Sequence, residues 1–157
     1  MLLLRRFRRI LLSSIGVFVL ICDQAVKIFL ASFLKPAESI PVIKNIFHIT
    51  LVFNTGCAFG LFKNQTTLIF LIASFLAIVF LVYSLKRLKG YYTFSKLAAI
   101  LIIAGSLSNL TDRFRLGYVV DFLDFRIWPV FNLGDTAITV GASIFVLQLF
   151  LEPKTKV

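Results

Sequence analysis

Apolar residues along the chain fall into long runs that are separated by short polar stretches. Four runs are long enough to cross a bilayer, because a membrane-spanning helix needs about 20 mainly apolar residues. We expect these transmembrane segments at about 10–34, 66–85, 94–112 and 133–152. The pattern therefore predicts an all-α integral membrane protein with four transmembrane helices, in a single domain over residues 1–157.

The stretch between the first two runs, residues 36–64, has a different texture. It is rich in Ile, Val, Phe and Thr, a composition typical of short strands. Its interruptions are Pro41, Asn45, Asn54 and Gly56. Open strands cannot face lipid, so we expect a small β-sheet platform at the membrane surface or beneath a cover of protein. Residues 114–132 are expected to form an outer loop with a short helix.

Composition supports a membrane location. The hydrophobic fraction is 59%, well above the roughly 45–50% of soluble domains. The net charge is +10, but the basic residues lie between apolar runs and not on a solvated face, as nucleic-acid binding requires. We therefore expect orientation signals and contact with membrane lipid, and no nucleic-acid partner.

Basic residues at the ends of the runs predict the orientation, because such residues gather on the cytoplasmic side. They are Arg5, Arg6, Arg8, Arg9, Lys86, Arg87, Lys89, Lys96, Lys154 and Lys156. Both termini are then cytoplasmic, and residues 36–64 and 114–132 are extracytoplasmic. The first run resembles a cleavable signal peptide, but it continues past Cys22 for a full span, so we expect it to be retained.

Acidic residues are scarce, yet four of the seven lie close together near the end of the chain. They are Asp112, Asp121, Asp124 and Asp135. Asp121 follows the third run and Asp135 opens the fourth, so both are expected at the same outer surface. Two carboxyls that share one proton can activate water and polarise a peptide carbonyl, as in aspartic proteases. With His48 as the single histidine, we expect neither a metal nor a cofactor.

The residues alone leave other interpretations open. Asp135 near a helix start is well placed as a cap or first-turn acid. Asp112 beside Arg113 suggests a local ion pair, and Asp124 a solvated interfacial residue. The same carboxylates could serve a small proton- or ion-conducting protein, but a relay needs acids at successive depths. The second and third runs carry none in their apolar cores.

Five ordered motifs add a resemblance that covers nearly the whole chain. They are "DQAVK" (23–27), "FNTGCAFG" (53–60), "GSLSNLTDR" (105–113), "VVDF" (119–122) and "FNLGDTAI" (131–138). In this order they closely resemble the lipoprotein signal peptidase family, also called signal peptidase II. Three positions depart from the common family residue: Ser108 replaces Gly, Cys57 replaces Ala and Gly134 replaces Ala.

The resemblance implies that Asp121 and Asp135 are the catalytic dyad of an intramembrane aspartic peptidase. It also implies residues that support the dyad or bind the substrate: Asp23, Lys27, Asn54, Gly56, Asn109, Arg113, Asn132 and Ala137. Asp23 and Lys27 are four apart, so they also suit a mutual helical ion pair. Asp124 has no counterpart in the "VVDF" motif and is not expected to be catalytic, although a helical turn would place it on the same face as Asp121.

The family removes the signal peptide from diacylglyceryl-modified prolipoproteins, and it cleaves just before the lipidated cysteine at the outer membrane–water interface. The resemblance therefore implies a prolipoprotein substrate, contact with membrane lipid and inhibition by the cyclic peptide globomycin. It places the chain in the bacterial cytoplasmic (inner) membrane as a multi-pass protein, and we expect a monomer. The segment 122–129, which includes Trp128, is expected to act as a flap.

Overall fold

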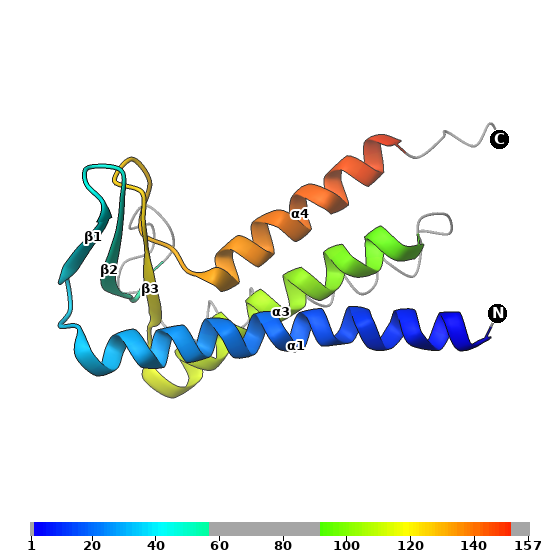
Figure 1. The fold of residues 1–157 in the computed structure, drawn as a ribbon, viewed down its shortest axis with the longest axis horizontal. Coiled ribbons are helices and arrows are strands. Elements are labelled where there is room, and N and C mark those ends of the chain that lie inside the picture. The colour runs from blue at the N-terminus through cyan, green and yellow to red at the C-terminus, as the bar shows by residue number, and fades with distance from the viewer. Residues whose placement is uncertain (1, 57–91, 152–157) are drawn as a thin grey trace.

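The computed structural model describes residues 2–56 and 92–151 (Figure 1). The elements are α1 (Leu2–Phe33), β1 (Ser39–Ile43), β2 (Phe47–Asn54), α3 (Tyr92–Leu116), β3 (Val119–Asp124) and α4 (Leu133–Leu151). α3 packs against both α1 and α4, and the three strands gather at the end where α1 stops and α4 begins. The expected span at 66–85 and Cys57 lie outside the described residues.

Two of the described helices are long and apolar enough to cross a membrane. The apolar stretches are Ile10–Phe33 and Phe94–Leu116, whereas that of α4, Leu133–Gln148, is shorter. α1 starts well before the predicted span because the arginine-rich N-terminal residues favour helix. At 1.5 Å per residue its 32 residues extend about 48 Å, which exceeds the bilayer core.

The predicted small sheet is confirmed, and it includes a third strand from outside residues 36–64. The strand order is β1-β2-β3, with both pairs antiparallel. β3 lies in the region expected to be a loop with a short helix, and this part of the expectation was wrong. Nearly all of its residues are buried, so its sequence lacks the alternation that marks a strand with one solvated face.

The polarity of the molecule is inverted relative to a soluble protein. Large apolar side chains such as Phe18, Phe29 and Phe150 point outward, whereas Asp23, Ser108 and Asn132 are fully buried. Lipid accepts an apolar surface at no cost, but it offers no partner to a polar group. The interior must therefore satisfy its own polar groups.

A small apolar core fastens the sheet to the end of α1. It contains Leu30 and Leu34 of α1, Leu51 of β2, and Val120 and Phe122 of β3. Val120 and Phe122 flank Asp121 in sequence, and in a strand their side chains lie on the opposite face from that of Asp121. The core thus holds β3 with the Asp121 carboxylate turned away from it.

Candidate active site

Asp121 is held in the middle of β3 by two side-chain amides. Its carboxylate is 1% exposed. The Oδ1 atom accepts a hydrogen bond from Asn132 Nδ2 at 2.6 Å, and Oδ2 accepts one from Asn54 Nδ2 at 2.8 Å. The backbone N–H of Gly56 donates to Asn54 Oδ1 at 3.0 Å and so orients the Asn54 amide. Three sequence-predicted residues, Asn54, Gly56 and Asn132, therefore converge on Asp121.

Asp135 reaches the same place through the cap of α4. The Asp135 N–H donates to Asn132 Oδ1 at 2.9 Å, and the Asn132 N–H donates to Asp135 Oδ2 at 3.3 Å. This reciprocal pairing of the residue before the helix with the third helical residue is a capping box. The sequence left a cap and a catalytic pair open as alternatives for Asp135, and the structure shows the cap. Asn132 touches both carboxylates, so the cap itself brings Asp135 beside Asp121.

Asn109 of α3 fixes the other oxygen of Asp135. Its Nδ2 donates to Asp135 Oδ1 at 2.7 Å. Its Oδ1 accepts from Lys27 Nζ at 3.0 Å and from Asn132 Nδ2 at 3.1 Å. Because Asn109 Oδ1 accepts both of these bonds, the Asn109 amide has one orientation, in which Nδ2 faces the Asp135 carboxylate. Asn109 therefore links Asp135 to a buried cation.

Lys27 is that cation, and its side chain is only 2% exposed. Its Nζ lies 2.7 Å from Asp23 Oδ2, four residues earlier on α1, and 2.8 Å from Asp112 Oδ2 on α3. With Asn109 Oδ1 as the third acceptor, all three donors of the ammonium are used. The helical pair expected between Asp23 and Lys27 is present, within a larger cluster.

Asp112 is the residue whose position the sequence least anticipated. Besides Lys27, it accepts from Gln24 Nε2 at 2.8 Å and from the Val120 N–H at 3.1 Å. Asp112 thereby connects α1, α3 and β3. Its contact on β3 is Val120, the residue before Asp121. Ser108 adds a donor to Asp23 Oδ2 at 2.6 Å. The scarcity of acidic residues is the one sequence feature that points to this role of Asp112. A carboxylate in an apolar protein interior needs a cation as a partner.

Burial changes the protonation of Asp121. Desolvation raises the pKa of Asp121 to about 7, the hydrogen bond from Asn54 opposes this rise, and the negative charge of Asp135 adds to it. Near neutral pH, the protonated and the ionised forms of Asp121 are therefore both populated. A carboxyl of this kind can act as a general acid or base, depending on its partner.

Asp124 lies in the same strand but serves a different purpose. Side chains alternate along a strand, so residues three apart point to opposite faces, and Asp124 faces away from Asp121. Its Oδ2 accepts from Thr50 Oγ1 at 2.7 Å and from Arg126 Nη1 at 3.0 Å, and its Oδ1 from the Arg126 N–H at 2.8 Å. Burial acts to raise the pKa of Asp124, but the bonds from Thr50 and Arg126 prevail and lower it. Asp124 thus stays ionised, and its hydrogen bonds connect β2 to the turn after β3.

Two predicted residues take more peripheral positions. Ala137 is buried in the second turn of α4, where a methyl group contributes packing alone. Arg113 lies in the last turn of α3, where its charge complements the helix dipole. Among the described residues, no group of three or more His, Cys, Asp or Glu side chains is arranged to hold a metal ion.

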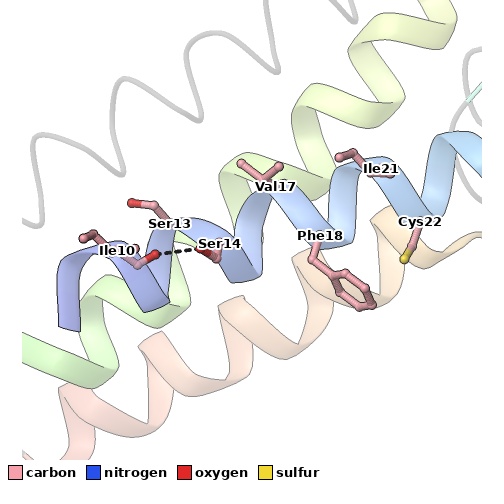
Figure 2. A pocket seen from close by; sticks show the side chains of 7 residues that line it. All are labelled: Ile10, Ser13, Ser14, Val17, Phe18, Ile21 and Cys22. Carbon is pink, nitrogen blue, oxygen red and sulfur yellow. Dashed lines mark hydrogen bonds between the residues drawn. The ribbon is translucent and has the colours of Figure 1, made fainter. Parts of the chain in front are cut away.

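A shallow apolar hollow on α1 is separate from this site. Its lining is Ile10, Ser13, Ser14, Val17, Phe18, Ile21 and Cys22 (Figure 2). The Ser14 hydroxyl donates to the Ile10 carbonyl of its own helix at 3.0 Å. The hollow offers apolar surface and no acid–base pair, and the carboxylate cluster remains the candidate active site.

The Lys27 cluster predicts a stability effect. Lys27→Met keeps the unbranched length but leaves Asp23 and Asp112 buried without a cation. Breaking a buried ion pair in this way costs about 3–5 kcal/mol, so the unfolding temperature in detergent should fall sharply. Lys35→Met, at an exposed position, is the matched control and should cost less than about 0.5 kcal/mol. Equal unfolding temperatures for the two variants would show that the cluster does not hold the helices together.

Comparison with known proteins identifies the family. The model of the signal peptidase (SPase) II family matches residues 15–151. The lipoprotein signal peptidase of Halothermothrix orenii is 45% identical over 137 residues, which cover 87% of this chain and 92% of the relative. That of Moorella thermoacetica is 44% identical over 137 residues, with 87% and 91% covered.

Solved structures agree with the sequence relatives. One described as a bacterial membrane enzyme, determined by the in meso method at 2.3 Å resolution, superposes with a TM-score of 0.81. It is 32% identical, and the match covers 92% of each chain. With the family model over most of its length and close relatives beside it, the chain belongs to the signal peptidase II family.

Proposed function

We propose that this protein is an aspartic endopeptidase that removes the signal peptide from diacylglyceryl-modified prolipoproteins, cleaving just before the lipidated cysteine. Family membership supports the reaction. The observation that carries the residue assignment is Asn132, which donates its N–H to Asp135 and its Nδ2 to Asp121. One residue thus holds a buried and a half-buried carboxyl together, and we assign Asp121 and Asp135 as the catalytic dyad.

The proposed chemistry needs one proton shared by the pair. The ionised carboxylate takes a proton from a water molecule, and the water oxygen attacks the carbonyl carbon of the residue before the cysteine. The protonated carboxyl donates to the carbonyl oxygen, which gives a tetrahedral diol. Collapse of the diol breaks the C–N bond. The proton taken from water passes to the leaving amine of the cysteine, and one diol hydroxyl returns a proton to the carboxylate that had donated it, which restores the shared proton of the dyad. The pKa of Asp121, raised to about 7, suits this alternation of roles.

The supporting amides and the cation have separate tasks in this scheme. Asn54, Asn109 and Asn132 hold each carboxylate in a fixed orientation, so little rearrangement accompanies proton transfer. Lys27 is one residue removed from the dyad, through Asn109. We assign Asp23 and Lys27 as support for the dyad, and Arg113 as a residue near the substrate backbone.

The proposed setting is the outer surface of the bacterial cytoplasmic membrane. Four spans, including one at 66–85, would place both termini in the cytoplasm and the sheet outside. The strands lie at one end of the helices (Figure 1), and exposed apolar side chains after β3, Ile127 at 93% and Trp128 at 60%, suit an interfacial platform and flap. There the enzyme would act as a monomer on a lipid-anchored substrate, with globomycin as an inhibitor.

The alternative of a proton or ion path is not favoured. A relay needs acids at successive depths through the bilayer. In the described part of the chain, the acids of α1, α3, β3 and α4 are linked into one network by Lys27, Asn109 and Asn132. This grouping is that of a site at one surface.

Substitution of the aspartates tests the dyad. Asn keeps the size and polarity of Asp but cannot cycle a proton, so Asp121→Asn and Asp135→Asn should each lower kcat by at least about 1000-fold. Asp124→Asn, which weakens the hydrogen bonds on the opposite face, should cost about tenfold or less. The assay is cleavage of a lipidated prolipoprotein by purified enzyme in detergent.

Two compounds added to the assay distinguish the carboxylate mechanism from metal-dependent cleavage. Globomycin should block the wild-type cleavage, and a metal chelator should leave it unchanged. Activity that chelation removes and zinc restores would overturn the carboxylate mechanism, and a dead Asp124→Asn beside an active Asp121→Asn would show that the wrong aspartate had been assigned.

The raised pKa of Asp121 predicts a pH dependence. Cleavage should decline as the pH rises through about 7, because the dyad then loses its shared proton. Between about pH 4 and pH 7 the folded state holds a proton that the unfolded chain has released, so the stability contributed by Asp121 falls as pH rises. Asp121→Asn should therefore gain stability relative to wild type from about pH 5 to about pH 8. A pH-independent difference in unfolding temperature would contradict the raised pKa.

The proposed orientation is open to a labelling test. Single cysteines introduced in a background without Cys22 and Cys57 should react with a membrane-impermeant maleimide in intact cells at positions 44 and 127. Lys89→Cys should react only after the membrane is opened. Labelling of the position 89 cysteine from outside would reverse the topology and place the dyad on the wrong side for a prolipoprotein.

A further inference from the structure

α3 and α4 approach each other closely at two glycines, Gly105 and Gly134, beside the proposed dyad. A Cβ atom on Gly105 of α3 would overlap the carbonyl oxygen of Gly134 in α4. It would also lie 3.0 Å from the Gly134 carbonyl carbon and 2.9 Å from Ile138 Cγ1. The obstacle is backbone, which cannot rotate away as a side chain can. Any side chain at Gly105 must therefore push the two helices apart.

The contact between Gly105 and Gly134 lies next to the hydrogen bond that Asn109 donates to Asp135. Asn109 follows Gly105 by one helical turn on the same face, and Asp135 follows Gly134 in sequence. The Asn109 Nδ2 to Asp135 Oδ1 distance of 2.7 Å spans the same two helices. The backbone contact thus sets the helix separation at the point where the carboxylate receives its hydrogen bond.

We infer that Gly105 is a positioning residue of the reaction: its missing side chain lets α4 approach α3 closely enough for Asn109 to fix Asp135 within the dyad. This inference rests on the proposed function. It assigns Gly105 no contact with substrate or reacting atoms. The effect passes through the helix separation to the carboxylate.

Gly134 behaves differently from Gly105. A Cβ there would lie 3.0 Å from Asn132 Oδ1, 3.1 Å from the Gly105 carbonyl oxygen and 3.3 Å from Asn109 Oδ1. These contacts are tight, but shifts of a few tenths of an ångström relieve them. Alanine should therefore fit at position 134 at modest cost, whereas at position 105 the helices have to separate by on the order of 1 Å.

A matched control exists further along the same helix pair. A Cβ on Gly141 of α4 would lie 2.7 Å from the Ala98 carbonyl oxygen and 2.8 Å from Ile102 Cγ1 of α3. Gly141→Ala thus also forces α3 and α4 apart, but more than a turn beyond Asp135. A loss of packing alone should affect Gly105→Ala and Gly141→Ala alike, whereas a loss of positioning should affect only Gly105→Ala.

The experiment compares kcat, KM and the folded fraction of the purified variants with a lipidated prolipopeptide in detergent. Gly105→Ala should lower kcat per folded enzyme by about 100-fold with KM within about threefold of wild type, since a misplacement of about 1 Å has this effect. Gly141→Ala should keep kcat within about threefold, and Gly134→Ala should lose less than about tenfold. The last variant keeps the test informative if Gly105→Ala does not fold.

The pH profile provides a second readout. The charge of Asp135 contributes to the raised pKa of Asp121, so displacement of α4 should move the loss of kcat at high pH to lower pH in Gly105→Ala and less so in Gly134→Ala. An unchanged midpoint in both variants, or equal kcat losses in Gly105→Ala and Gly141→Ala, would overturn the inference. An active Asp121→Asn in the same assay would instead refute the proposed dyad, so the two failures are distinguishable.

Discussion

The ammonium group of Lys27 is the constraint on which the described structure depends. A buried cation in a protein with an apolar exterior cannot donate hydrogen bonds to bulk water, so its acceptors must come from the protein. Asp23, Asp112 and Asn109 supply them from two helices. These contacts fix the rotation of α1 against α3, a degree of freedom that apolar surfaces in lipid specify poorly because lipid tails solvate them equally well.

From this cluster the geometry passes to the dyad by hydrogen bonds alone. Asn109 transmits the position of the cation to Asp135, and Asn132 transmits that of Asp135 to Asp121. The second step uses a capping box, a motif that satisfies backbone donors at any helix start. The same residue that caps α4 therefore also holds Asp121 and Asp135 close together.

The sequence predicts those features that depend on local pattern. Apolar runs predicted spans, β-branched texture predicted a sheet, and ordered motifs pointed to Asp121 and Asp135. Features that depend on tertiary context were missed. β3 is almost fully buried, so alternation could not mark it as a strand, and Asp112 finds its cation far away on α1 although Arg113 is its neighbour in sequence. The opposite facing of Asp121 and Asp124 followed only once the segment was known to be extended.

Burial of Asp121 raises its pKa and also costs folding free energy. The desolvation that raises the pKa of Asp121 to about 7 also disfavours its ionised form in the folded protein. Hydrogen bonds to the carboxylate are needed to offset this cost. The amides of Asn54 and Asn132 offset part of that penalty without cancelling it, because a stronger donor such as a direct lysine contact would hold the carboxylate ionised. Lys27 stands one residue back, behind Asn109. That spacing leaves the cation near enough to organise the site and far enough for Asp121 to keep a proton within reach of neutral pH.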